Sequence, residues 1–222
     1  MKTKQNTITL AKGLRHALPK VSLLMFAAIG AKANAGVDLN QTWPPFALKK
    51  TQQPCLNQNL EFSQAAFSSM VAEQVTFSGS RIHKISIAVW FGLGSTATNF
   101  LSLCSGWSVY VGTTAELASG GGLVAIVGPS STTIGGEVPW ILNSRRLEVS
   151  GLNIAVTPGT TKNVALVPHV DSIHGGIWLL RNSLVGPNNG PPACMFFNPG
   201  NGFGLGASVP VTYNAAMRVE TL

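Results

Sequence analysis

Apolar and polar residues alternate most clearly in residues 71–91, VAEQVTFSGSRIHKISIAVWF. The odd-numbered positions in the second half of this segment are all apolar and share one side of an extended chain: Ile85, Ile87, Val89 and Phe91. A period of two is typical of a strand that lies with one face on a core. The segment therefore predicts a short strand, a turn at residues 78–80 and a long strand.

Further strands are predicted where the same period returns, at residues 107–111, 163–167, 176–181 and 213–219. The uninterrupted apolar run LVAIV at residues 123–127 predicts a buried strand. In residues 145–156 the apolar positions change from odd to even numbers at Ser150–Gly151. A shift of one residue would place the apolar set on the other face, so we expect a bulge or a corner there.

Turn signals recur about every eight to twelve residues, which is the spacing of a sandwich. Only 10% of the residues are charged, and 24 glycines and 13 prolines supply many tight turns. We therefore predict an all-β fold, an antiparallel jelly-roll-like β-sandwich formed by residues 60–222 as a single domain. Residues 36–59 are polar and interrupted by proline, and we interpret them as an extended N-terminal lead-in.

Residues 1–35 have the pattern of a cleaved signal peptide. Five basic residues precede the short apolar run VSLLMFAAI, and Ala33–Asn34–Ala35 forms an A-x-A cleavage signal. The apolar run is too short to cross a bilayer by itself, so we expect cleavage after Ala35 and no transmembrane segment in the remainder. The predicted location is secreted or periplasmic.

Cleavage of the expected leader would also change the net charge of the remaining chain. Six of the 15 basic residues lie in the leader and none of the eight acidic residues does, so nine basic and eight acidic residues remain. The pI near 9.7 therefore belongs largely to the leader and does not indicate nucleic-acid binding. Three cysteines remain as disulfide candidates, Cys55, Cys104 and Cys194, and their spacing leaves all three pairings open.

The order of several segments resembles secreted bacterial jelly-roll domains of the kind found in proteins with a PEP-CTERM sorting tail. Residues 71–77 followed by ISIAVWFG at 85–92 resemble the paired "V-A-D-D-F" and "I-T-G-I-x-W-x-G" strands of those domains. Residues 107–111, 156–160 and 215–220 resemble later strands in the same order. The sorting tail itself is absent, and Glu73–Gln74 replaces the paired Asp. The resemblance implies the fold and an exported location, but it implies no activity.

Two groups of residues are candidates for a chemical or binding role. His169, Asp171 and His174 combine imidazole and carboxylate groups that could hold a transition metal, although they equally fit a polar loop between strands. Trp140 and Trp43 lie beside prolines and could present aromatic faces to a sugar. Asn188 and Asn189 could supply the hydrogen bonds, whereas the other tryptophans, Trp90, Trp107 and Trp178, are expected in the core.

These observations predict an exported, non-enzymatic structural or interaction protein of the bacterial envelope or extracellular space, with no cofactor. Its partner would be an extracellular polysaccharide or a cell-surface protein. The first alternative is a carbohydrate-binding module that uses exposed tryptophan. The second alternative is a metal-dependent enzyme centred on His169, Asp171 and His174.

Overall fold

A computed structural model describes nine stretches of the chain: residues 36–41, 48–49, 56–60, 65–91, 97–138, 141–170, 176–182, 194–211 and 213–222. The expected leader and its cleavage site lie outside these stretches. Within them, no helix has both the length and the apolar character needed to cross a membrane.

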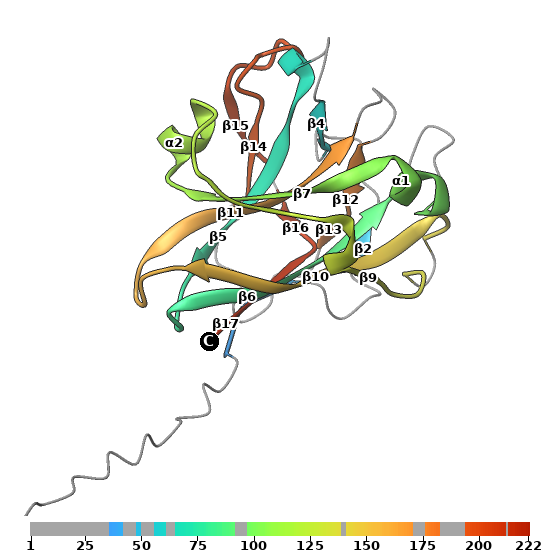
Figure 1. Cartoon of the computed structure of the whole chain (residues 1–222). Helices are drawn as coiled ribbons and strands as arrows, with labels where there is room; N and C mark the ends of the chain where they lie inside the picture. The colour runs from blue at the N-terminus through green and yellow to red at the C-terminus, as the bar shows by residue number, and fades with distance from the viewer. Residues whose placement is uncertain are drawn as a thin grey trace, which may run out of the picture. The chain divides into compact units, whose positions relative to one another are not determined.

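The first of two large sheets, sheet 1, contains both ends of the described chain (Figure 1). Its strands follow the order β1 (Gly36–Asn40), β17 (Met217–Thr221), β6 (Arg81–Trp90), β10 (Ser144–Ala155) and β9 (Thr132–Ile134). Next to β6 lies β12 (Ile177–Leu179), and next to β12 lies β3 (Leu56–Asn57). All pairs in this sheet are antiparallel.

Sheet 2 follows the order β15 (Ser208–Pro210), β14 (Met195–Phe197), β5 (Met70–Thr76), β11 (Thr161–Val170), β7 (Cys104–Gly112) and β8 (Leu123–Val127). Its pairs are antiparallel except that β4 (Asn59–Leu60) joins β11 in parallel. A small third sheet contains β16 (Asn214–Ala215), β13 (Arg181–Asn182) and β2 (Leu48–Lys49).

Two of the places where the chain passes from one large sheet to the other are tight turns. Strand β5 pairs with β11 in sheet 2, and β6, which follows β5 in the chain, pairs with β10 in sheet 1. The turn at residues 78–80 and the turn at residues 157–160 therefore each carry the chain from one sheet to the other. The predicted all-β antiparallel sandwich is confirmed.

The core lies between the two sheets and is formed by the alternating residues that the sequence pattern selects. Ile85, Ile87 and Val89 of β6 are fully buried there, opposite Trp107 and Val109 of β7. The last two strands repeat the pattern, since Ala215 of β16, Met217 and Val219 of β17, and Tyr213 just before β16 all belong to the same core cluster. Removal of this much apolar surface from water is the main stabilising contribution to such a fold.

The predicted bulge in β10 is confirmed. The pairing of β10 with β6 shifts between Ser150 and Ile154, and Gly151 has a φ of 73°. That left-handed conformation is easy for glycine and costly for other residues. The shift returns Leu152 and Ile154 to the core after Leu147 and Val149, so all four residues are buried.

Among the described residues, four short helical segments connect the strands: α1 (Ala97–Leu103), α2 (Thr114–Ala118), η2 (Ala65–Phe67) and η3 (Pro129–Ser131). A capping box begins α2, because Thr113 Oγ1 accepts from the Glu116 N–H (3.2 Å) and the Glu116 carboxylate accepts from the Thr113 N–H (2.6 Å). The T-x-x-E spacing that begins at Thr113 is a sequence signal for the start of a helix.

Two expectations about the strands need correction. Residues 123–127 do form a strand, but β8 is the edge of sheet 2 and much of it is exposed, with Ile126 at 63%. An apolar run predicts a strand, but it does not show whether another part of the structure covers the side chains of that strand. The sandwich also begins at Gly36, not at residue 60, because β1 pairs with β17 and both β3 and β4 join the large sheets.

Candidate functional site

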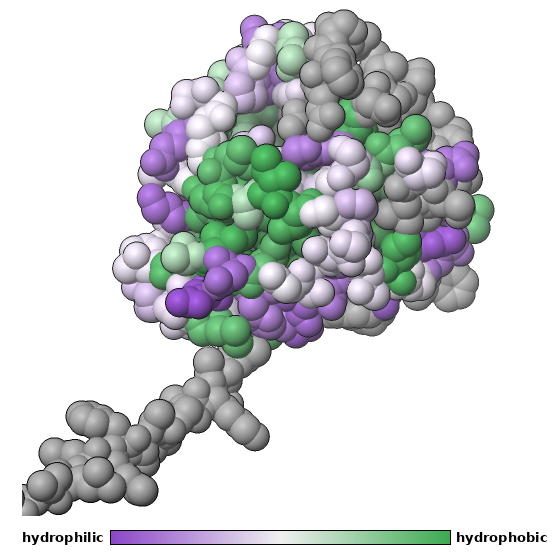
Figure 2. Space-filling view, in the orientation of Figure 1, coloured by the Kyte–Doolittle hydropathy of each residue, from purple (hydrophilic) through white to green (hydrophobic). Residues whose placement is uncertain are grey.

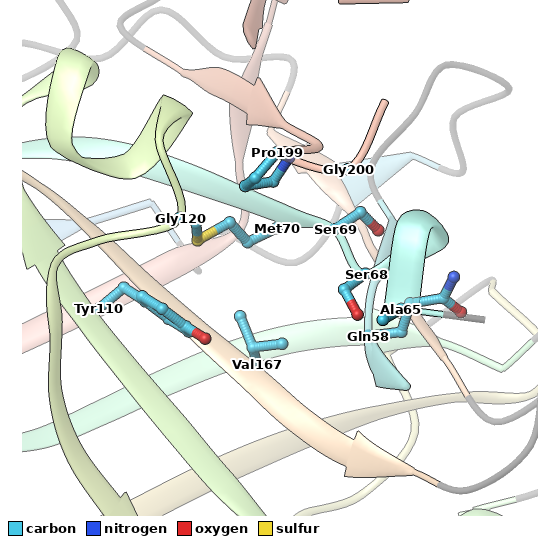
Figure 3. A pocket seen from close by; sticks show the side chains of 10 residues that line it. All are labelled: Gln58, Ala65, Ser68, Ser69, Met70, Tyr110, Gly120, Val167, Pro199 and Gly200. Carbon is cyan, nitrogen blue, oxygen red and sulfur yellow. The ribbon is translucent and has the colours of Figure 1, made fainter. Parts of the chain in front are cut away.

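A pocket of about 200 Å³ lies on the face of sheet 2 that points away from the core. Met70 of β5 and Val167 of β11 form its centre, and Tyr110 of β7 lies on one side (Figure 3). Ser68, Ala65 and Gln58 lie on the opposite side in the same view, with Pro199 and Gly200 along a third side. Three strands of one sheet thus hold the floor rigidly, while the chain before β5 and the turn after β14 form the walls.

Register explains why these side chains meet. The pairing of β11 with β7 places Ala165 opposite Tyr110 and Val167 opposite Ser108, so that all four point outward while Trp107 and Val109 point to the core. Met70, Ala72, Ala165 and Val167 are buried in a second, smaller apolar cluster on this outer face.

Asn198, which is fully buried, holds one wall of the pocket against another. Its side-chain nitrogen donates to the carbonyl oxygens of Ala66 (2.7 Å) and Ser68 (2.8 Å), and its oxygen accepts from the Phe203 N–H (3.1 Å). Gly202 N–H also donates to the Ala66 carbonyl oxygen at 2.8 Å. One amide therefore fixes Pro199 and Gly200 relative to η2, which is a structural role that no local sequence pattern indicates.

Ser108 and His169 form a polar contact on the same face of sheet 2 as Tyr110. Ser108 Oγ lies 2.5 Å from His169 Nε2, and Ser108 also hydrogen-bonds to the Tyr110 hydroxyl. Burial raises the pKa of Tyr110, and the bond to Ser108 partly opposes that rise. The pairing of β7 with β11 thus brings His169 to Ser108 and Tyr110, which are next to each other on one face of β7.

A serine next to a histidine is also the core of a nucleophilic dyad, but here the serine is not accessible. Ser108 is 1% exposed. A nucleophile must reach its substrate and needs donors placed where negative charge develops. We therefore interpret Ser108 and His169 as a structural hydrogen-bonded pair that holds the Tyr110 side of the pocket.

None of the described residues that line the pocket is charged. Its polar side chains are engaged only in part. Gln58 Nε2 donates to the Phe67 carbonyl oxygen at 2.9 Å, and Ser68 and Ser69 each have a partner, whereas Gln58 Oε1 is buried without a hydrogen bond from the described residues. The surface left for a ligand is mainly the apolar floor, the Tyr110 ring and the Pro199 ring. Such a lining suits a neutral and largely apolar group.

His169 is the one predicted metal ligand that the structure describes, since Asp171 and His174 lie outside the described residues. The imidazole of His169 is directed to Ser108 by the contact above. Across the described stretches no three His, Cys, Asp or Glu side chains gather as a metal site would require. The metal hypothesis itself stays a prediction.

The cysteine candidates are described in part. Cys104 and Cys194 are both buried thiols, and Cys55 lies outside the described residues. Burial raises the pKa of the Cys104 thiol, which donates to the Gly106 carbonyl oxygen at 3.1 Å. Cys194 lies next to the buried carboxyl group of Glu73.

The four residues proposed to bind sugar, Trp43, Trp140, Asn188 and Asn189, all lie outside the described residues. Of the three tryptophans expected in the core, Trp107 is fully buried there. Trp90 and Trp178 are half-buried on the outer face of sheet 1, opposite each other across β6 and β12, with their ring centroids 6.4 Å apart. Trp178 also packs against the main core cluster, whereas Trp90 packs against a separate, smaller apolar cluster.

The outer face of sheet 1 also has a shallow charged groove. Glu220 is nearly buried there and forms ion pairs with Lys84 Nζ and with Arg218 Nε, both at 3.0 Å. Lys84 also lies 3.6 Å from Glu148. Because these charges neutralise one another within the sheet, we interpret this groove as a structural ion-pair network.

Comparison with models of protein families, with curated proteins and with solved structures finds no match to this chain. The fold and the site therefore define a class only: a β-sandwich with an uncharged pocket on the outer face of one sheet.

Proposed function

We propose that this chain is an exported, non-enzymatic interaction protein of the bacterial envelope or extracellular space, and that the pocket beside Tyr110 binds its partner. The observation that carries the proposal is the uncharged pocket with an apolar floor, held open by Asn198 on a rigid sheet. The pattern of the leader supports export.

The group that best fits this pocket is an apolar side chain from another protein. Interface hot spots are anchor side chains that fill well-packed pockets, and methionine and tyrosine are adaptable and common at such surfaces. A volume of about 200 Å³ is below the usual range for whole small-molecule ligands, but it suits one such anchor.

The test is to pan a random peptide library displayed on phage against the purified protein. Ala65 is exposed at the rim of the pocket, so Ala65→Trp should fill the pocket without a change in the sheet. Ala155, at the end of β10 in sheet 1, is also exposed and does not line the pocket, so Ala155→Trp is the matched control. We expect selected peptides to share an apolar anchor, to lose binding to Ala65→Trp and to retain binding to Ala155→Trp. Peptides that bind all three proteins equally would contradict the proposal.

Carbohydrate binding is a second candidate, and the half-buried pair Trp90 and Trp178 favours it. Aromatic faces stack on the apolar faces of sugar rings, and Trp90 and Trp178 are neighbours on a rigid sheet. A panel of insoluble and extracellular polysaccharides, followed by tryptophan fluorescence, tests this candidate. Binding that is lost in Trp178→Ala and kept in Leu142→Ala would support it, because Leu142 is an exposed apolar residue outside the pair.

A further inference from the structure

Strand β8 leaves one backbone edge of sheet 2 open. Among the described strands only β7 pairs with it, so its other side presents unpaired N–H and C=O groups. Its apolar side chains are exposed as well, with Leu123 at 47%, Val124 at 45% and Ile126 at 63%. Figure 2 shows apolar residues gathered on the face where α2 and β7 lie in Figure 1, and β8 is the neighbour of β7.

This edge lacks the charges that usually protect such strands. Proteins normally protect edge strands with lysine, inward-pointing charge or proline, because an open edge pairs with other chains. No charged residue occurs between Glu116 and Glu137, and Pro129 follows the strand without interrupting it. A bulge is another protecting device, and β8 has one opposite Val109 and Tyr110, but its extra residue, Val124, is apolar and 45% exposed.

We propose that β8 is the interface through which two copies of this chain associate, by antiparallel pairing of β8 with β8 across a two-fold axis. The proposal does not depend on the pocket beside Tyr110. It would join two copies of sheet 2 into one continuous sheet.

The sequence of β8 favours a second copy as the occupant. With Ala125 on the two-fold axis, Leu123 of one copy lies opposite Val127 of the other, and Val124 lies opposite Ile126. Antiparallel strands exchange hydrogen bonds symmetrically, and apolar, β-branched cross-strand pairs stabilise them. No like charges meet in this arrangement, and an interface of this symmetry needs only a self-complementary patch.

The next strand along the chain, β9, also lies at a sheet edge and exposes an apolar side chain. Only η3 and one glycine separate β8 from β9, which is the edge of sheet 1, and Ile134 of β9 is 42% exposed. Five residues form a short interface, so we expect a reversible equilibrium between monomer and dimer instead of a permanent dimer.

Sedimentation of the purified protein over a range of concentrations tests this inference. We expect the wild-type protein to form a dimer as its concentration rises and Ile126→Lys to remain a monomer. Leu142→Lys makes the same change at an apolar residue that is 78% exposed and lies outside β8, so it should dimerise like the wild type. Circular dichroism would verify that both variants fold.

A cross-link tests the register independently. Ala125→Cys would place two thiols directly opposite each other, within the separation that a disulfide requires, so mild oxidation should give a covalent dimer. Leu142→Cys should give none. A wild-type protein that stays monomeric, a dimer that Ile126→Lys leaves intact, or an Ala125→Cys protein without a cross-link would each overturn the inference. Binding of a different extended peptide at β8 by a monomer would replace the second copy as occupant.

Discussion

The carboxyl group of Glu73 accepts a hydrogen bond from the backbone N–H of Ala215 in the interior of the sandwich. Gln41 completes the site when its amide nitrogen faces inward, donating to the Ala215 carbonyl oxygen at 2.7 Å and to Glu73 Oε1 at 3.2 Å. Glu73 has no exposed surface, and its burial raises the pKa from 4.5 to about 8 against the effect of these bonds.

The stability of the protein should therefore fall as the pH rises from about 5 to 8. The unfolded chain releases the Glu73 proton near its ordinary pKa, whereas the folded protein retains it up to about pH 8, so a higher pH favours the unfolded chain. The loss in the free energy of unfolding should be about 3–5 kcal/mol across this range. Urea unfolding at several pH values measures it.

Glu73→Gln is the control for this effect, since glutamine has a similar shape and cannot ionise. The variant should lose most of the pH dependence and should be more stable than the wild type at pH 8. An equally steep pH profile in Glu73→Gln would assign the effect to other groups.

Asn198→Ala should loosen the pocket as well as the fold. The change removes three hydrogen bonds of a fully buried amide and leaves the Ala66 and Ser68 carbonyl oxygens without that donor. We expect a loss of about 2–4 kcal/mol in the free energy of unfolding and weaker binding of any peptide that the pocket selects. Asn153→Ala removes an exposed amide that bonds to Arg81 and should change neither quantity.

Ser108→Ala should destabilise the Tyr110 side of the pocket. The alanine removes the partner of His169 Nε2 and of the Tyr110 hydroxyl while it keeps the packing of the strand. The expected loss is about 1–2 kcal/mol, measured by thermal or chemical unfolding. Ser130→Ala, at an exposed serine in η3, should have no measurable effect. Equal effects of the two changes would argue against the Ser108–His169 pair.

Gly151→Ala should cost about 1 kcal/mol through the backbone alone, because φ is 73° there and an added Cβ would meet no atom within 4 Å. Gly136 has the same open surroundings without a positive φ, so Gly136→Ala should be neutral or slightly stabilising. Differential scanning calorimetry of the two variants isolates the conformational strain at Gly151, because neither added Cβ makes a steric contact. A neutral Gly151→Ala would show that the bulge in β10 does not depend on glycine.

The alternation of residues along the chain determined the strands, their inward sides and the bulge at Ser150–Gly151. These features follow from local geometry, because side chains alternate on an extended chain and only glycine readily adopts the conformation at the bulge. The tertiary structure decided which strands have neighbours on both sides. It made the apolar LVAIV segment an exposed edge and left Trp90 and Trp178 on an outer face. It also joined Tyr110, Ser108 and His169 through the register of β7 and β11, and gathered Glu73, Gln41 and Ala215 in the interior. Pairing between distant strands depends on the packing of the whole chain, so no local pattern could predict these sites.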